Sequence, residues 1–386
     1  MKVLISIDSL KGSLSSIEAA NAIKKGILKV KKDSKIKILP LADGGEGTVD
    51  ALVQGMNGKK ETIEVTGPII TKVNATYGLL KSTNTVIIEM AQASGLTLVP
   101  TELRNPLNTT TYGVGEIIKE AINKGYRNFI VGIGGSATND AGVGMLQALG
   151  FEFYDKNNEL VGLGGKVLNE IRNIKVDNRL KELDECNFKI ACDVNNPLFG
   201  KNGAAYIYGP QKGATPEIVE QLDNGLRNFS KVAKSNLNKD VSNVEGVGAA
   251  GGLGFAFLAF LNSKLESGVK IILDEIKLED EIKYVDLVIT GEGRLDNQTA
   301  MGKAPIGVAK MAKKYGVKVI GLAGATTEDA VKCNEEGIDA YFSIVNRAMT
   351  IEEAMDKETA SNNMTATTIQ IFNLITSIQQ SNNKSY

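Results

Sequence analysis

The sequence predicts an α/β protein with two different α/β domains: a doubly wound parallel sheet built from both chain ends, and an inserted mixed α/β domain. Two observations predict this. Near both ends, apolar runs alternate with segments that carry helix-start signals, as in strand–helix–strand units. Between them, β-branched runs follow one another with only turn residues in between, which is typical of an antiparallel meander. We expect residues 1–59 and 285–386 to form the discontinuous domain and residues 60–284 the insert.

The first elements follow from apolar runs and one capping signal. The run KVLISI predicts a buried strand over residues 2–7. Ser15 and Glu18 have the spacing of a capping box, so we expect a helix over residues 16–30. The run IKILPLA predicts a second strand over residues 36–42, and the glycine-rich turn ADGGEGT after it opens a second helix.

The middle of the chain begins with the runs ETIEVTG, VNATYGLL and TVIIEMA, which predict three strands of an antiparallel meander. Helices and strands then alternate again, and the very apolar run AAGGLGFAFLAFL predicts a buried helix. We expect strands over residues 128–133 and 188–193. We expect helices over residues 113–124, 139–149, 215–236 and 249–261.

Towards the C-terminus the simple alternation resumes. We expect strands over residues 286–290, 317–323 and 340–345, with helices between them and a last helix over residues 351–379. In open parallel sheets, ligands bind beyond the carboxyl ends of the strands. Acidic side chains stand at three such ends, and we expect them to converge on a cleft between the domains. They are Asp8, Asp43 and Glu292.

Composition excludes several classes of protein. With 44 Lys and Arg against 45 Asp and Glu, the net charge is −1, so nucleic-acid binding driven by counterion release is not expected. No apolar run is long enough to span a bilayer. Cys186, Cys192 and Cys333 lack CxxC spacing, and we expect reduced thiols in a cytoplasmic protein. Histidine is absent, which excludes Ser-His-Asp chemistry and histidine metal sites, and favours a hard cation such as Mg²⁺.

Four glycine-rich turns each carry ionisable side chains. Glycine lets the backbone approach a ligand closely and point its N–H groups at it, and a nearby charge can complete a phosphate or metal site. Together the turns indicate a large site for an anionic ligand. The charged residues are Asp43 and Glu46 in ADGGEGT, Asp140 in GIGGSATND, Lys212 in YGPQKGA, and Glu292, Arg294 and Asp296 in ITGEGRLDNQT.

One of these turns also matches a dinucleotide-binding pattern. GIGGSA, from residue 132, fits GxGxxA after a strand, and Asp155 lies where a ribose-binding acid is expected. This leaves an NAD-dependent hydroxy-acid dehydrogenase as an alternative, although the chain lacks a histidine acid/base. A second match, GVGAAG over residues 246–251, we interpret as helix packing or a tight turn. No GxxxxGK[ST] motif is present, so an ordinary P-loop NTPase is excluded.

Taken together in order, the runs DSLKGSLSSIEAANAIKKG, LPLADGGEGTVDAL, GIGGSATNDAGVGMLQALG, ACDVNNPLFGKNGAAYIYGPQKGA, GAAGGLG and DLVITGEGRLDNQTAMGKAPIGVA closely resemble the type 1 glycerate kinase family. The resemblance is collinear from residue 2 to about 355. It implies phosphorylation of D-glycerate by ATP and Mg²⁺, to 2-phosphoglycerate in most bacterial members, with the choice between O2 and O3 left open. It also implies a flavodoxin-like domain built from both chain ends with an inserted α/β domain. Ile7, Leu10 and Val114 depart from the family pattern.

The resemblance points to ten charged residues of this chain. They are Asp8, Lys11, Asp43, Glu46, Asp140, Asp193, Lys212, Glu292, Arg294 and Asp296. We expect Asp296 and Glu292 to hold Mg²⁺, and Arg294 to bind the glycerate carboxylate, because its planar fork suits a bidentate pair. The remaining binding roles fall on Glu46 and Asp140 for substrate, and on Lys11, Lys212, Lys303 and the turn residues Gly134, Gly135 and Ser136 for ATP.

Without histidine, the glycerate hydroxyl must lose its proton to a carboxylate or to phosphate itself. Asp8, Asp43 and Asp193 are the candidates. We favour Asp193, because it follows the apolar strand FKIAC, where partial burial would raise its pKa. A non-catalytic nucleotide-binding regulator remains a further alternative. We expect a small-molecule enzyme that is a monomer or homodimer, with no nucleic-acid or membrane partner.

Overall fold

The computed structural model describes residues 1–42, 44–45 and 47–382. It divides into two compact units. The terminal unit comprises Met1–Asp43, Asp50–Met56 and Ile272–Tyr386, and the insert unit comprises Gly44–Val49 and Asn57–Ile271. Each unit is a set of residues that contact one another more than they contact the other unit. The domain boundaries expected at 59/60 and 284/285 stay a prediction.

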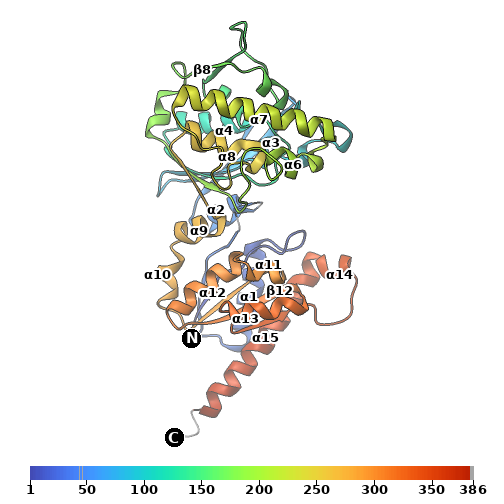
Figure 1. Cartoon of the computed structure of the whole chain (residues 1–386). Coiled ribbons are helices and arrows are strands. Elements are labelled where there is room, and N and C mark those ends of the chain that lie inside the picture. Colours follow the sequence, from blue (N-terminus) through green and yellow to red (C-terminus); the bar gives the residue numbers. More distant parts are fainter. Residues whose placement is uncertain (43, 46, 383–386) are drawn as a thin grey trace. The chain divides into compact units, whose positions relative to one another are not determined.

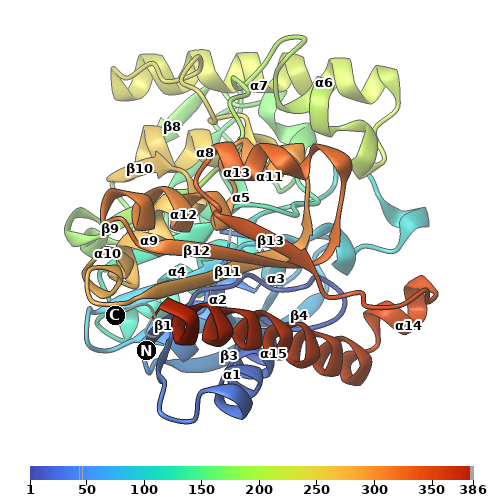
Figure 2. The same ribbon diagram turned by 90° about the horizontal axis from the view of Figure 1, so that it is seen from below.

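The terminal unit is built on a five-stranded sheet in the order β2-β1-β11-β12-β13, and every neighbouring pair is parallel. Numbered along the unit, this is the flavodoxin-like order 2-1-3-4-5. The predicted fold class is therefore confirmed. The strands are β1 Lys2–Ile5, β2 Lys35–Ile38, β11 Leu287–Leu295, β12 Lys318–Thr326 and β13 Ala340–Ser343. Figure 2 shows β11, β12 and β13 side by side.

Helices cover both faces of this sheet. The capping box of Ser15 and Glu18 forms as predicted and starts α1, Ser16–Val30. This helix packs against α15, Lys357–Asn382, where the Thr365 hydroxyl donates to the carbonyl oxygen of Ala22. Both helices share one apolar cluster with alternate residues of β1. The helix α12, Ala304–Lys314, packs on β11 and β12 without entering that cluster, so it covers the other face (Figure 1).

Two expectations for the terminal unit were wrong in extent. The strand expected to end at residue 290 continues through GEGR, because Glu292 and Arg294 pair with Ala323 and Ala325 of β12. The expected C-terminal helix is two helices, since Asp356 has non-helical backbone angles between α14, Ile351–Met355, and α15. The remaining helical segments near this unit are α2 Thr48–Gly55, α9 Gly268–Glu275, α10 Leu278–Ile282, α11 Asn297–Ala300, η6 Glu328–Val331 and α13 Lys332–Glu335.

The insert unit contains a mixed six-stranded sheet in the order β3-β4-β5-β6-β9-β10. The pairs of β3 with β4 and of β4 with β5 are antiparallel, which confirms the predicted meander, and the other pairs are parallel. The strands are β3 Lys59–Thr66, β4 Lys72–Leu80, β5 Thr85–Glu89, β6 Asn128–Gly132, β9 Asn187–Ala191 and β10 Ser263–Glu266. A separate antiparallel pair consists of β7 Glu152–Tyr154 and β8 Asn173–Lys175.

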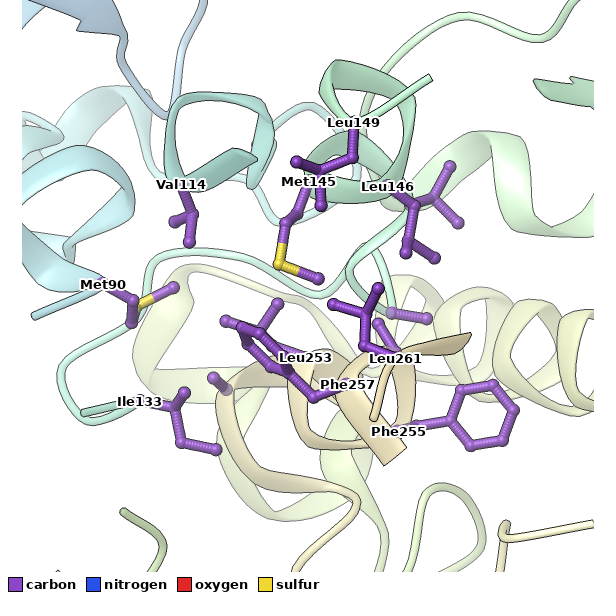
Figure 3. Packing of buried hydrophobic residues seen from close by; sticks show 14 of the residues in the cluster. Met90, Val114, Ile133, Met145, Leu146, Leu149, Leu253, Phe255, Phe257 and Leu261 are labelled. Carbon is purple, nitrogen blue, oxygen red and sulfur yellow. The ribbon is translucent and has the colours of Figure 1, made fainter. Parts of the chain in front are cut away.

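The helices of the insert unit are α3 Ala91–Ser94, α4 Tyr112–Asn123, α5 Val143–Ala148, α6 Ala204–Tyr208, α7 Pro216–Leu237 and α8 Ala249–Phe260. Short 3₁₀ segments are η1 Leu96–Leu98, η2 Thr101–Leu103, η3 Gly165–Asn169, η4 Lys181–Glu185 and η5 Pro210–Lys212. The apolar helix α8 is buried as predicted. Figure 3 shows its Leu253 and Phe257 pointing towards Met145 of α5.

The helix expected from residue 139 begins only at Val143. Ala141 and Gly142 adopt left-handed backbone angles, with φ of 50° and 73°, so residues 139–142 form a turn. Gly251 lies against this turn, and a Cβ atom there would come within 2.0 Å of the Thr138 carbonyl oxygen. The interpretation of GVGAAG as a packing turn is therefore confirmed. Over the described residues, no helix is long and apolar enough to cross a membrane.

Candidate active site

A cavity of about 630 Å³ lies at the carboxyl ends of the central strands of the terminal unit. It is lined by parts of residues 8–13, 292–303, 324–325 and 345–355, and we name it the switch-point cavity. Here the chain order of the sheet reverses, because β1 is followed by β2 on one side and adjoins β11 on the other. Doubly wound sheets bind their ligands at this position.

Asp8 and Lys11 reach the cavity from the turn that follows β1. Asp8 continues the path of the strand, since its N–H donates to the Gly291 carbonyl oxygen at 2.9 Å. The residue is only 6% exposed, and its Oδ1 accepts a hydrogen bond from the Ser9 N–H at 2.6 Å. Lys11 is exposed at the cavity wall. The turn thus brings one carboxylate and one ammonium group to the same cavity.

The end of β11 and the start of α11 form a chain of charged contacts. Arg294 donates from Nε and Nη2 to Oδ2 of Asp296, at 2.9 and 2.7 Å. Asp296 caps α11 by accepting the Thr299 N–H, and the Thr299 hydroxyl donates to Glu292 at 2.6 Å. Lys303, which precedes α12, lies 3.8 Å from Glu292. The structure therefore brings together the predicted residues Glu292, Arg294, Asp296 and Lys303.

These contacts keep Asp296 charged. Burial by itself raises the pKa of the Asp296 carboxyl, but the hydrogen bonds from Arg294 and Thr299 and the charge of Lys303 outweigh it. The net pKa is therefore below the ordinary value of an aspartic acid. A carboxylate that stays ionised can hold both a guanidinium group and a metal ion.

The acidic side chains of the cavity fit a magnesium ion. Mg²⁺ takes oxygen ligands and is commonly held by one or two carboxylates, water and substrate phosphates. Asp8, Glu292 and Asp296 all line the cavity. Across the described part of the chain, no three acidic or sulfur side chains form a ready-made metal cluster. Carboxylate oxygens such as these are the type of ligand that Mg²⁺ takes.

Sequence reasoning missed the part of the wall that residues 345–355 supply. One signal for it is present. Thr350 and Glu353 have capping-box spacing, and both hydrogen bonds of that box form at the start of α14. The spacing marks where the helix begins, but nothing in it indicates that the helix borders a site.

In the insert unit, the turn after β6 presents exposed backbone at Gly134 and Gly135, where Gly135 has a φ of 74°. Lys212 is only 2% exposed and lies beneath this turn. Its Nζ donates to Ser136 Oγ and to the Thr138 carbonyl oxygen, both at 2.7 Å. Burial lowers the pKa of the Lys212 ammonium to about 7, although the charge of Asp140 acts in the opposite direction.

Asp140 is fully buried in the same turn. Its Oδ2 accepts from the N–H and hydroxyl of Thr111 at 2.8 and 2.9 Å, and its Oδ1 accepts from the Gly142 N–H at 3.1 Å. Burial raises the pKa of the carboxyl, and these hydrogen bonds offset part of that rise. The geometry gives Asp140 a structural position with no exposed surface for substrate. Thr111, which sequence reasoning missed, is its main partner.

Asp193 follows β9, and its Oδ1 accepts a hydrogen bond from the Gly268 N–H at 3.1 Å. The side chain is exposed, so the partial burial on which its choice as base rested is absent. The strand β9 ends at Ala191, and burial decreases along the chain after it, since Cys192 is partly buried and Asp193 is exposed. The predicted residues Asp43 and Glu46 lie outside the described residues.

Comparison with known proteins decides the family. The model of the glycerate kinase family matches residues 3–376. The chain belongs to the glycerate kinase family. It is similar to the glycerate 2-kinase of Escherichia coli K12, with 48% identity over 92% of this chain and 93% of that protein. It is also similar to the glycerate kinase of Haemophilus influenzae, with 49% identity over 90% and 92%. A crystal structure assigned to glycerate kinase 2 of Salmonella typhimurium LT2 superposes with a TM-score of 0.91 at 45% identity, covering 98% of this chain and 99% of that one.

The alternative of an NAD-dependent dehydrogenase is wrong for this glycerate kinase. A dinucleotide fingerprint needs a helix that starts at the glycines, and here α5 starts only at Val143. Asp155, the expected ribose-binding acid, accepts hydrogen bonds from the N–H groups of Asn157 and Glu159 in the turn after β7. It therefore shapes a hairpin turn, away from the end of a parallel strand.

Proposed function

We propose that this glycerate kinase transfers the γ-phosphoryl group of ATP to O2 of D-glycerate with Mg²⁺, at the switch-point cavity. The observation that carries the proposal is the gathering of three carboxylates and three cations at one cavity, at the position where doubly wound sheets generally bind their ligands. Phosphoryl transfer depends mostly on positioning and on neutralising charge. The choice of O2 is supported by the 48% identity to the protein named glycerate 2-kinase.

In this proposal Arg294 binds the carboxylate of glycerate. Asp296 occupies the Nε and Nη2 edge of the guanidinium group, which fixes the plane of the fork and leaves its Nη1 side for the substrate. Lys11 and Lys303 meet the phosphates of ATP. Bound Mg²⁺ would neutralise the phosphate oxygens, and Glu292 and Asp296 would hold it.

We assign the general base to Asp8. It lines the cavity, it is 6% exposed, and the Ser9 N–H fixes one of its oxygens, so the carboxylate has a set position. Asp193, by contrast, is exposed and does not line this cavity. The expectation that Gly134 and Gly135 bind phosphate through their exposed backbone stays a prediction, and Lys212 donates to Ser136 of the same turn.

The activity itself is the first expected result. Purified protein with ATP, Mg²⁺ and D-glycerate should release ADP and form 2-phosphoglycerate, and EDTA in excess over Mg²⁺ should stop the reaction. A coupled ADP assay measures the rate, and ³¹P NMR of the product separates the 2-phosphate from the 3-phosphate. Turnover that persists in EDTA, or formation of the 3-phosphate, would contradict the proposal at the metal or at the position of transfer.

Arg294→Lys is expected to raise KM for D-glycerate at least about tenfold, equivalent to ~1.4 kcal/mol, because lysine keeps the charge and loses the planar fork. KM for ATP should stay close to the wild-type value. The matched control is Arg179→Lys, since Arg179 pairs with Asp184 at 2.7 Å on the surface of the insert unit. An unchanged KM for glycerate in Arg294→Lys would remove Arg294 from the substrate site.

A further inference from the structure

The switch-point cavity has two unlike walls. One wall carries the carboxylates and cations described above. The other is apolar and comes from a single stretch of chain, with Val345 and Met349 before α14 and Ile351, Ala354 and Met355 within it. The proposed reaction uses only the charged wall.

Large apolar side chains on this second wall are open to solvent. Ile351 is 74% exposed, Met355 is 42% exposed and Val345 is 38% exposed. Ile351 and Met355 are four residues apart in α14 and therefore lie on one helix face. Several exposed apolar side chains around one cavity mark a binding surface, whereas single ones need no explanation.

The apolar wall is attached to the charged wall. The Met355 methyl group lies so close to Gly12 that a Cβ atom on Gly12 would come within 2.6 Å of it. Gly12 has a φ of 78° and follows Lys11 in the turn that also carries Asp8. A ligand that touches Lys11 therefore has the face of α14 within its reach.

The size of the cavity points to a ligand larger than glycerate. Cavities of about 300–1,000 Å³ accommodate drug-sized ligands, and this one measures about 630 Å³. Glycerate is a small polar acid with no apolar group to cover the second wall. ATP combines a polyanion with a flat purine ring, and thioether sulfur atoms such as those of Met349 and Met355 make favourable contacts with aromatic rings.

We propose that the apolar wall formed by Val345, Met349, Ile351, Ala354 and Met355 receives the adenine ring of ATP, while the triphosphate faces Lys11 and Lys303. This rests on the proposed function, in which ATP is the phosphoryl donor at the same cavity. The wall thereby selects a nucleotide over inorganic polyphosphate, because only the nucleotide covers the exposed side chains.

The test uses the full chain and measures binding separately from turnover. Isothermal titration with MgADP and with magnesium tripolyphosphate is performed on the wild type, on Ile351→Glu and on Ile378→Glu. Ile378 is a matched control, because it is 53% exposed on α15 and does not line the cavity. In Ile351→Glu the Kd for MgADP should rise at least about tenfold, as expected for loss of an apolar contact with a ring. The Kd for tripolyphosphate should rise less than about threefold in comparison.

Ile378→Glu should bind both ligands as the wild type does. Equal losses for MgADP and tripolyphosphate in Ile351→Glu, or unchanged MgADP binding, would overturn the adenine assignment. Because MgADP binding needs no glycerate, a wild type that binds MgADP through Ile351 but does not phosphorylate D-glycerate would support this inference and contradict the proposed function. If the wild type phosphorylates glycerate and Ile351→Glu keeps the wild-type KM for ATP, the result would support the proposed function and contradict the adenine assignment.

Discussion

Asp8→Asn is expected to lower kcat for D-glycerate by about 100-fold, the lower range for loss of a positioned general base. Asparagine keeps the shape of the side chain, and its Oδ1 can still accept the hydrogen bond from the Ser9 N–H. KM values for ATP and glycerate should therefore change little, since the substitution removes basicity and leaves the turn in place. Steady-state kinetics with both substrates varied measure the separation of kcat from KM.

Two further variants make this result specific. Asp33→Asn is the matched control, because Asp33 is exposed just before the amino end of β2, whereas Asp8 follows the carboxyl end of the parallel strand β1. Its kinetics should equal those of the wild type. Asp193→Asn tests the residue that sequence reasoning favours. A fall in kcat of less than about fivefold for Asp8→Asn, with a larger fall for Asp193→Asn, would return the role of base to Asp193. Circular dichroism melts show whether each variant folds as the wild type does.

Elements with strong local signals could be predicted from the sequence. The helix α1 starts and ends at the expected residues because the Ser15–Glu18 capping box fixes its start. The three strands of the meander were predicted because β-branched runs between turns admit few other structures. The parallel sheet followed from strands separated by helices, and its switch point explains why the predicted residues Glu292, Arg294 and Asp296 share a cavity with Asp8.

Burial of individual charged residues could not be predicted, because it depends on segments far apart in sequence. The local sequence of Lys212, a glycine-rich turn, is typical of an exposed cation, yet its ammonium group lies beneath residues 136–138. Asp193 follows an apolar strand and is nevertheless exposed. The continuation of β11 through Glu292 and Arg294 has the same origin, since its pairing with β12 is a tertiary contact that overrides the glycines of the local sequence.

The wall formed by α14 shows a further limit. The capping box of Thr350 and Glu353 is readable from the sequence, and it predicts the start of a helix. Only the fold shows that Ile351 and Met355 of that helix border the same cavity as Arg294. A short amphipathic segment carries no pattern that separates a surface helix from one that faces a ligand.

Lys212→Met is expected to lower activity with ATP and to change the pH dependence of stability. Methionine keeps much of the side-chain volume but donates no hydrogen bond, so Ser136 and the carbonyl group of Thr138 lose their partner. Residues 134–136 would then be held less firmly. We expect kcat/KM for ATP to fall by about 100-fold, since a displacement of about 1 Å in a positioned group costs that much.

The pH dependence of stability identifies the cause of this effect. An unfolded lysine has a pKa of 10.5, and in the fold burial lowers the pKa of Lys212 to about 7. Between these two pKa values the unfolded chain binds one more proton than the folded chain does. The free energy of unfolding of the wild type therefore rises with pH over this range. Below pH 7 the free-energy cost of burying the charged ammonium is fully present. Lys212→Met should lose this rise. Urea unfolding of both proteins from pH 6 to about 10 measures it, as a difference that cancels other titrating groups.

Lys231→Met is the control for this measurement, because Lys231 is exposed on α7 of the same unit. Its unfolding free energies should run parallel to those of the wild type at every pH, and its kinetics should be unchanged. If the unfolding free energies of Lys212→Met also run parallel to those of the wild type, Lys212 does not change its protonation on folding between pH 7 and 10.5. Kinetics of Lys212→Met close to the wild type would show that the turn at residues 134–136 needs no support from Lys212. Loss of the pH-dependent rise together with loss of kcat/KM for ATP is the outcome that a buried, positioning lysine requires.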